Sequence, residues 1–359
     1  MAGARKGRAI MAELVIHIGD CKAGSTSIQR VLDAGGWEAR GGAQLAYAAA
    51  ARRNAAHHLL ADAVFMDRKR ARAPAVYAAL ASELAACPAQ RLVISSERFE
   101  FADPAALREL IDRHMPAALP DLRLIAYVRP HAERVVSGYA QRTKQGKIDL
   151  SLEAFHDKTL RRGGFMFAPR LSRWQEVFGP RLTVRPMIRD RLLKRCVVHD
   201  FVGWAAGTDD VSLAVPAEAN SSVTLEDLAI IRLIRQAAPR PRQVQALCRR
   251  LAELMEATPP AGGTRLKLHR SLAERIARDY AEDAAAVDAR FFGGAPILAT
   301  ALQDAVARAL PAPQELSPEA LLPPELLRAG RMLAQLIGEA AAPGKGRMRL
   351  ARAGADDED

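Results

Sequence analysis

A short polar segment near the N-terminus, residues 19–27, has residue types and spacing suited to binding an anion. It follows an apolar run rich in β-branched residues and precedes a helical pattern with Ile28, Val31 and Leu32 on one face. A strand, a glycine-bounded turn and a helix in this order direct backbone N–H groups and the positive end of a helix at one spot. The segment therefore predicts a binding site for a phosphate or sulfate group.

The position of the lysine separates this segment from the Walker A loop. In that pattern, G-x-x-x-x-G-K-[ST], the lysine follows the second glycine. Here Gly19 and Gly24 have the required separation, but Ser25 occupies the lysine position and the lysine occurs earlier, as Lys22. The order Lys-x-Gly-[ST]-[ST] resembles the 5′-phosphosulfate loop of sulfotransferases that use 3′-phosphoadenosine 5′-phosphosulfate (PAPS). The loop alone leaves open an ordinary βα turn built from small residues.

A second pattern follows the buried strand predicted for residues 122–128. The strand ends at Arg129, and Pro130 suits the first turn of the next helix, which carries Ser137 and Tyr139. A guanidinium offers a forked pair of donors to a phosphate, and a hydroxyl on the adjacent helix adds another. The Arg…Ser-x-Tyr spacing resembles the 3′-phosphate motif of PAPS sulfotransferases.

The resemblance, which is to bacterial members of the family, implies a role for each of these residues. Lys22 would neutralise the leaving-group oxygens, and Arg129 and Ser137 would hold the 3′-phosphate. A late basic loop closes over that phosphate in the family, which indicates Arg265 here, or Lys267 in the same loop. PAPS would be the sulfuryl donor, with no metal expected. The 5′-phosphosulfate would be bound by Lys22, Ala23, Gly24, Ser25, Thr26 and Ser27.

The general base is the least defined part of this site. Glu97 follows a second buried strand, residues 91–96, whose C-terminal end faces the same crevice in a parallel sheet. His57 and His58 belong to a predicted helix for which Asn54 is a suitable N-cap, and two adjacent residues cannot share one helix face. Relatives use a histidine or a glutamate for this step. Glu97, His58 and His57 therefore all stay candidates, with Glu97 preferred.

The order of strands and helices predicts an α/β fold. The resemblance makes it three-layer α/β/α around a central parallel sheet, the P-loop NTPase-like fold of sulfotransferases, followed by a helical C-terminal extension. The expected boundaries are a flexible N-terminal tail at 1–11, the α/β domain at 12–295, the helical extension at 296–343 and a disordered tail at 344–359.

Composition narrows the class of protein. The chain has 359 residues, a formal net charge of +11 and no apolar stretch of the roughly 18 residues that a membrane span needs. Its four cysteines are scattered without a C-x-x-C pair, which argues against a zinc site or disulfide framework and suits the reducing cytoplasm. Aromatic content is only 5% and nucleic-acid-binding signatures are missing, so no nucleic-acid partner is expected.

These patterns favour an enzyme that moves a sulfuryl group from PAPS to an acceptor hydroxyl. The resemblance suggests a carbohydrate or glycan acceptor, and an anionic one would suit the net charge; a small molecule or a lipid stays open. A P-loop kinase or NTPase would need a lysine at position 25 and a strand ending in a magnesium-binding aspartate. A non-catalytic anion- or nucleic-acid-binding protein on the same fold is the third hypothesis. The oligomeric state is not written in the sequence.

Overall fold

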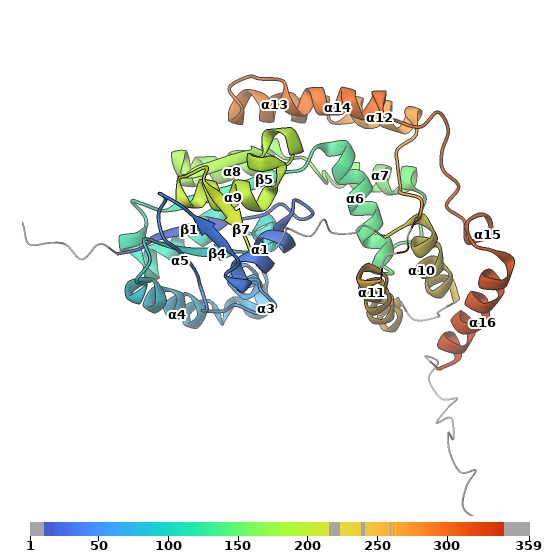
Figure 1. Ribbon diagram of the computed structural model, residues 1–359, viewed down its shortest axis with the longest axis horizontal. Helices are drawn as coiled ribbons and strands as arrows, with labels where there is room; N and C mark the ends of the chain where they lie inside the picture. Colours follow the sequence, from blue (N-terminus) through green and yellow to red (C-terminus); the bar gives the residue numbers. More distant parts are fainter. Residues whose placement is uncertain (1–10, 215–222, 238–240, 259, 261, 341–359) are drawn as a thin grey trace, which may run out of the picture. The chain divides into compact units, whose positions relative to one another are not determined.

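The computed structural model describes residues 11–214, 223–237, 241–258, 260 and 262–340 (Figure 1). The tail expected at 344–359 and all but the last residue of the tail expected at 1–11 lie outside these residues. The chain divides into two compact units, each assembled from three segments. The first contains residues 1–134, 165–219 and 277–304, and the second contains residues 135–164, 220–276 and 305–359.

A parallel sheet of five strands forms the centre of the first unit, in the order β3-β4-β1-β5-β6. Its central strands are almost wholly buried and apolar, as expected for strands covered on both faces. The predicted α/β fold with a parallel sheet is therefore confirmed. The strands are β1 (Glu13–His17), β3 (Leu45–Tyr47), β4 (Arg91–Ser95), β5 (Arg123–Val128) and β6 (Leu182–Pro186).

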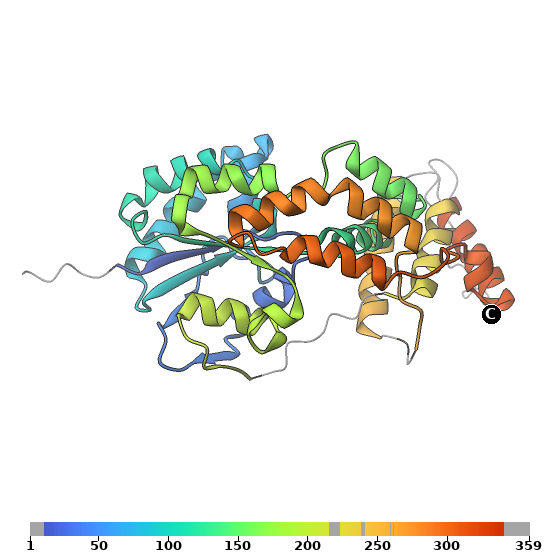
Figure 2. The ribbon, with the colours of Figure 1, turned by 90° about the horizontal axis from the view of Figure 1, so that it is seen from above.

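Helices cover both faces of this sheet (Figure 2). On one face α1 (Ser25–Ala34) and α9 (Val197–Ala206) pack over a core that includes Val15, Val93 and Ile125. A small antiparallel pair, β2 (Trp37–Ala39) and β7 (Val211–Leu213), borders this core. The helices packed together on the other face are α4 (Ala73–Ala86), α5 (Pro104–His114) and α8 (Ala168–Phe178).

The first residues of three strands anchor the C-terminal end of α9. Arg91 donates to the carbonyl of Ala205 at 2.6 Å and to Glu13 at 2.6 Å. Arg123 donates to the carbonyls of Trp204 and Ala205 at 2.9 and 3.2 Å. These carbonyls lie in the last turn of the helix, where the dipole is negative, so cations there are stabilising. The N-terminal edge of the sheet is thus fastened to α9, and the C-terminal edge carries the loops.

The remaining helices connect or extend the first unit. The helix α2 (His58–Phe65) and the single turn α3 (Asp67–Arg70) precede α4. Further along the chain, α13 (Ala281–Phe291) lies in the third segment of this unit. Three helices contain the divisions between the units, namely α6 (His131–Lys144), α12 (Arg270–Asp279) and α14 (Ile297–Ala307).

The second unit is helical. Its core holds Ile231, Val244, Cys248 and Ala334. Thr224 and Asp227 form a capping box: each backbone N–H of this pair donates to the other's side chain, at 3.0 and 3.1 Å. Its helices are α7 (Leu152–Leu160), α10 (Leu225–Ala237), α11 (Pro241–Ala257), α15 (Pro318–Leu321) and α16 (Pro324–Ala340). Across the described ranges, none of the helices combines the length and apolarity that crossing a membrane requires.

Candidate functional site

The polar segment at residues 19–27, here called the anion loop, connects the central strand β1 to α1 and includes the first turn of α1. It lies between the C-terminal ends of β4 and β5. Its two glycines adopt left-handed conformations, with φ of 88° at Gly19 and 81° at Gly24. A Cβ on Gly19 would lie 2.6 Å from the Cα of Glu97, and one on Gly24 would lie 2.7 Å from a methyl of Val197. Both positions therefore need glycine for conformation and for space.

The first turn of α1 directs backbone donors outward. Gly24 is the N-cap and has no side chain to occupy them, and the first turn, Ser25 to Ile28, carries no acidic residue. The amides of Ser27 and Ile28 both donate to the carbonyl of Gly24, at 3.1 and 3.2 Å, so the positive end of the helix at Ser25 and Thr26 is the part that suits an anion. Thr26 is exposed, whereas Ser25 is buried and its hydroxyl donates to the carbonyl of Asp20 at 3.3 Å. The amide of Ala23 also donates to that carbonyl, at 3.2 Å, so this amide braces the loop.

Lys22 and Arg129 meet at the loop. Lys22 is half-buried and has φ of 65°, which is uncommon for a residue with a side chain. Its carbonyl accepts a hydrogen bond from Nη1 of Arg129 at 3.0 Å. Arg129 follows β5 directly, and its Nε lies 3.4 Å from Oε2 of Glu133, one turn along α6. The structure thus brings the predicted lysine and arginine together through the backbone of the loop.

Glu97 lies beside the loop, just past the end of β4. Oε2 of Glu97 accepts a hydrogen bond from Nε2 of Gln29 in α1 at 3.0 Å, and Oε1 lies 3.7 Å from Nε2 of His58. The other ring nitrogen of His58 contacts the hydroxyl of Ser96 at 2.9 Å. The side chains of Glu97 and His58 are 25% and 30% exposed, so both are accessible to a ligand. Burial lowers the pKa of His58, and the adjacent Glu97 opposes that shift. The two candidate bases form one cluster.

His57 occupies a different environment from its neighbour. Its ring is fully buried; Nδ1 accepts from the amide of Ser95 at 3.1 Å, and Nε2 contacts the carbonyl of Ala48 at 2.8 Å. Burial lowers its pKa to about 4, so the ring is neutral near pH 7. Both nitrogens are used to join the backbone of β4 to the segment after β3, which leaves His57 without an accessible proton acceptor.

The helix that carries these histidines begins later than predicted. The prediction that Asn54 caps it is wrong, because Asn54 and Ala55 have φ of 49° and 62°. They form a tight turn closed by two backbone hydrogen bonds between Arg53 and Ala56, at 2.9 and 3.0 Å. Consequently α2 starts only at His58.

The other two predicted phosphate ligands belong to the second unit. Ser137 lies on α6 and is half-buried. Arg265 lies in the exposed segment between α11 and α12, and its carbonyl accepts a hydrogen bond from Gln314 at 3.0 Å. Their roles remain predictions from the sequence.

A buried cluster of charges beneath the loop was not predicted. Asp20 is fully buried and pairs with Arg170 of α8 at 2.5 Å. Glu100 accepts from the amide of Cys21 at 2.9 Å and from Arg134 at 3.3 Å. Burial raises the pKa of Glu100, but Arg134, Arg170 and the hydrogen bonds from Cys21 together outweigh it, so the pKa is lowered. Asp20 and Arg170 are 150 positions apart, so no local pattern could reveal the pair.

A row of hydrogen-bonded polar side chains joins the ends of β1 and β4 beside the loop. His17, the last residue of β1, contacts the hydroxyl of Ser95 at 2.8 Å, and Gln29 donates to the same hydroxyl at 3.2 Å. Burial lowers the pKa of His17 to about 3, so it is neutral. Gln29 therefore links the end of β1 to Glu97 and fixes the direction of that carboxylate.

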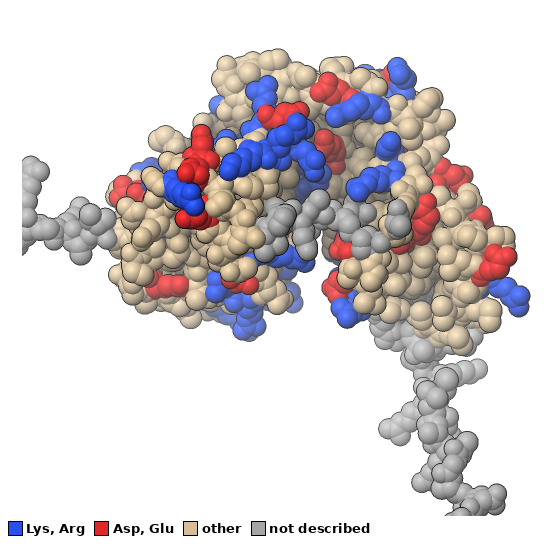
Figure 3. All heavy atoms as spheres, viewed as in Figure 1, with Lys and Arg blue, Asp and Glu red and all other residues tan. Residues whose placement is uncertain are grey.

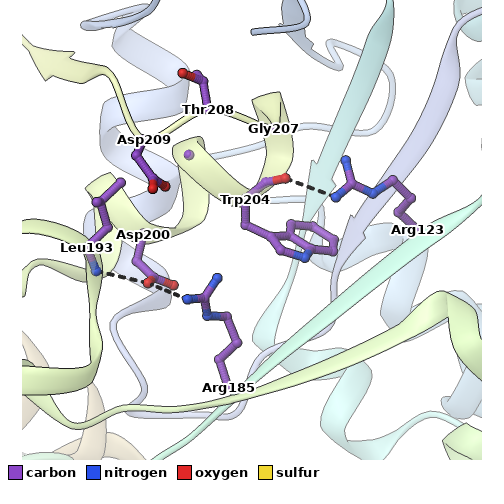
Figure 4. Close-up of a pocket in the computed structure, with 9 residues that line it drawn as sticks. Arg123, Arg185, Leu193, Asp200, Trp204, Gly207, Thr208 and Asp209 are labelled. Carbon is purple, nitrogen blue, oxygen red and sulfur yellow. Dashed lines mark hydrogen bonds and ion pairs between the residues drawn. The ribbon is translucent and has the colours of Figure 1, made fainter.

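A pocket of about 390 Å³ lies elsewhere in the first unit, beside α9 (Figure 4). The guanidinium of Arg123 lies 4.3 Å from the centre of the Trp204 ring, and Arg185 pairs with the buried Asp200 at 3.0 Å. Both arginines are thus occupied in holding α9, and no predicted site residue lines the pocket. Among the residues that the structure describes, no group of three or more histidine, cysteine, aspartate or glutamate side chains is placed to hold a metal.

Comparisons with known proteins give one structural similarity. No protein-family model matches the chain. No curated protein matches its sequence. The structure is similar to the crystal structure of a sulfotransferase from Alicyclobacillus acidocaldarius, with a TM-score of 0.40 and 14% sequence identity. The matched region covers 78% of this chain and 96% of that one.

Proposed function

We propose that the protein is a PAPS-dependent sulfotransferase that transfers a sulfuryl group to an acceptor hydroxyl. The observation that carries this proposal is the meeting of three groups at one edge of the sheet. The Lys22 loop follows β1, Arg129 follows β5, and Glu97, which lies beside His58, follows β4. Arg129 is bound to the Lys22 carbonyl, and Glu97 packs against Gly19. Ligands of open parallel sheets bind at this edge, where the strand order reverses.

Each group has a role in the proposed reaction. The first-turn amides of α1, with Lys22, would bind the 5′-phosphosulfate, and Lys22 would offset charge on the departing phosphate. Glu97, aligned by Gln29, would accept the acceptor's proton, with His58 as the alternative base. The acceptor oxygen forms a bond to sulfur while the bond from sulfur to the 5′-phosphate oxygen breaks. Arg129 and Ser137 are the proposed 3′-phosphate ligands, and Arg265, from the basic loop late in the chain, is proposed as a third.

The competing hypotheses differ in the nucleotide they require. A kinase or NTPase would place lysine after the second glycine, where this chain has Ser25, and would hold magnesium with a carboxylate. The carboxylates of Asp20 in the loop and of Glu100 beside it face arginines instead, at 2.5 and 3.3 Å. A protein that only binds anions would share the loop but would not need Glu97 oriented toward it.

The proposed acceptor is the hydroxyl of a carbohydrate or glycan, and an anionic one suits the net charge of +11. All four cysteines are free thiols, which fits activity in the reducing cytoplasm. Transfer of labelled sulfate from PAPS to a panel of glycans, lipids and small alcohols would identify the acceptor class.

Calorimetric titration with 3′-phosphoadenosine 5′-phosphate (PAP), compared with ATP and magnesium, tests the nucleotide. We expect micromolar binding of PAP and at least tenfold weaker binding of Mg-ATP. Arg129→Ala should remove PAP binding and Arg129→Lys should weaken it, because lysine keeps the charge but loses the fork. Arg173→Ala, which removes an exposed arginine paired with Asp103, is the matched control and should bind normally. Tight Mg-ATP binding without preference for a 3′-phosphate would refute the proposal.

A further inference from the structure

The buried charges beneath the loop present an electrostatic problem for an anion site. Asp20 belongs to the loop itself, and its backbone carbonyl accepts from both Ala23 and Ser25. An ionised Asp20 would place a negative charge directly under the loop. In a buried setting such repulsion is weakly screened and is worth far more than at the surface.

The contacts of Asp20 show an incompletely satisfied carboxyl group. Oδ1 pairs with Arg170, whereas Oδ2 is buried and has no hydrogen-bond partner. Nη1 of Arg170 and Nε of Arg134 are also buried without partners. A carboxylate with one unpaired buried oxygen is costly, while a protonated carboxyl carries no net charge and is much cheaper to bury.

The charged and titratable groups that face Asp20 belong to α8, to α6, to the 3₁₀ turn after β4 and to the loop itself. Arg170 of α8 and Arg134 of α6 favour its ionised form, and Glu100, in the 3₁₀ turn Glu97–Phe101, opposes it. On its own loop stand the neutral thiol of Cys21 and the cation of Lys22. Burial is the largest influence and raises the pKa of Asp20 to about 7, against the pull of Arg170.

We propose that Asp20 takes up a proton when an anion occupies the loop, so that anion binding and protonation of this buried carboxyl are coupled. This inference rests on the proposed function only in that the loop binds a phosphate or sulfate group. Protonation leaves Arg170 and Arg134 opposed by Glu100 alone, which adds one positive charge beneath the ligand. By reciprocity the ligand raises the proton affinity of Asp20 as much as the proton raises the affinity for the ligand.

The coupling has a measurable form. Above neutral pH the free protein has an ionised Asp20 and the complex has a protonated one, so log Kd should rise with pH by up to one per unit. Between pH 7 and 8.5 we expect the affinity for an anion to fall about tenfold. At acidic pH, where Asp20 is already protonated in the free protein, the affinity should be flat.

The test is calorimetry with PAP at pH 7.5 in two buffers of different ionisation enthalpy, which counts the protons taken up. The native protein should take up more protons than Asp20→Asn, by at least half a proton per ligand. Asparagine keeps an oxygen that accepts from Arg170 but cannot titrate. Protons exchanged by the ligand's own phosphates are the same in both proteins and cancel in the difference.

Asp62→Asn is the matched control. Asp62 is also buried and paired with an arginine, at 2.6 Å from Arg98, but its two basic partners lower its pKa more than burial raises it. Its variant should give the proton count of the native protein. If Asp20→Asn fails to fold, the pH dependence of inorganic sulfate binding to the native protein tests the coupling instead. Sulfate does not titrate between pH 5 and 9, so any change in its affinity comes from the protein.

The outcomes separate the two proposals. A lower proton count in Asp20→Asn, or sulfate affinity that falls with a midpoint near pH 7, supports the coupling. Tight PAP binding with equal proton counts, or sulfate affinity independent of pH, overturns the coupling and leaves the proposed function intact. A loop that binds neither PAP nor sulfate at any pH overturns both.

Discussion

Two residues at the loop edge have separable proposed roles that substitution can distinguish. Lys22 would act on the leaving group and Glu97 on the acceptor, and neither supplies the 3′-phosphate contacts. We expect Lys22→Ala and Glu97→Gln each to lower kcat by about 10²–10⁴-fold. The Kd for PAP should change less than threefold in Glu97→Gln, because this substitution leaves the loop in place.

Single-turnover transfer of labelled sulfate measures these effects. His58→Gln is the comparison that assigns the base, since His58 lies 3.7 Å from Glu97. His57→Gln should reduce stability rather than the chemical step, because both of its nitrogens contact backbone groups. Full activity in Glu97→Gln with loss in His58→Gln would move the base to the histidine.

At the scale of elements, the loop depends on glycine at a close approach between two strand ends. Gly19 and Gly35 both have positive φ, 88° and 66°, but only Gly19 would bring a Cβ against backbone, 2.6 Å from Glu97 Cα. Gly35→Ala should cost about 1 kcal/mol of stability, from backbone strain alone. Gly19→Ala should cost at least 2 kcal/mol more, because the Glu97 backbone must move.

Urea unfolding of the two variants measures this difference, and kcat of Gly19→Ala reports whether Glu97 has shifted. Equal losses of stability in the two variants would contradict the close packing of Gly19 against Glu97.

The sequence predicted those elements whose pattern is local. The buried strands at the loop, at Glu97 and at Arg129 are short apolar runs that end in polar residues, and their length and composition identify them. The edge strand β3 and the pair β2–β7 were not predicted, because strands of three residues are too short to show a clear period. Asn54 suggested a helix cap, but its side chain tolerates the left-handed region equally well.

The candidate site was predictable only in part for a related reason. Lys22, Glu97 and Arg129 follow strand ends, so their meeting follows from the parallel sheet. The partners of Asp20 and Glu100 come from helices far along the chain, and nothing in the sequence pairs them. The division into two units is also unmarked, because each unit is assembled from three separate segments.

At the scale of the whole molecule, buried titratable groups give stability a definite pH dependence. His17 and His57 have pKa values lowered to about 3 and 4, so near pH 5 the unfolded chain binds two protons that the folded protein does not. Asp20, with a raised pKa, holds one proton in the folded state that the unfolded chain lacks. For these groups the difference is 2 − 1 = 1 proton, so stability should fall on acidification by about 1.4 kcal/mol per pH unit.

Denaturant unfolding at pH 4.5 and 5.5 checks this slope. In Asp20→Asn the opposing contribution is gone, and stability should fall about twice as steeply over the same range. A variant slope equal to that of the native protein would mean that Asp20 is ionised in the folded state throughout.

The net charge is also a property of the whole molecule. On the face drawn in Figure 3, lysine and arginine are interspersed with acidic side chains, and do not form one unbroken basic surface. A polyanion gains most from a continuous stripe of positive charge. The face drawn there therefore does not present the continuous positive stripe that suits a nucleic-acid strand.

The two arginines at the N-terminal edge of the sheet affect how the protein can change over evolutionary time. Arg91 and Arg123 tie α9 to the strands at the edge opposite the loops. A scaffold fastened at one edge tolerates insertions and substitutions at the other, where no strand register depends on them. Divergent descendants would then be expected to vary first in the segments around Glu97 and His58, and last at these two arginines. Libraries aimed at new acceptors should sample the former and leave the latter unchanged.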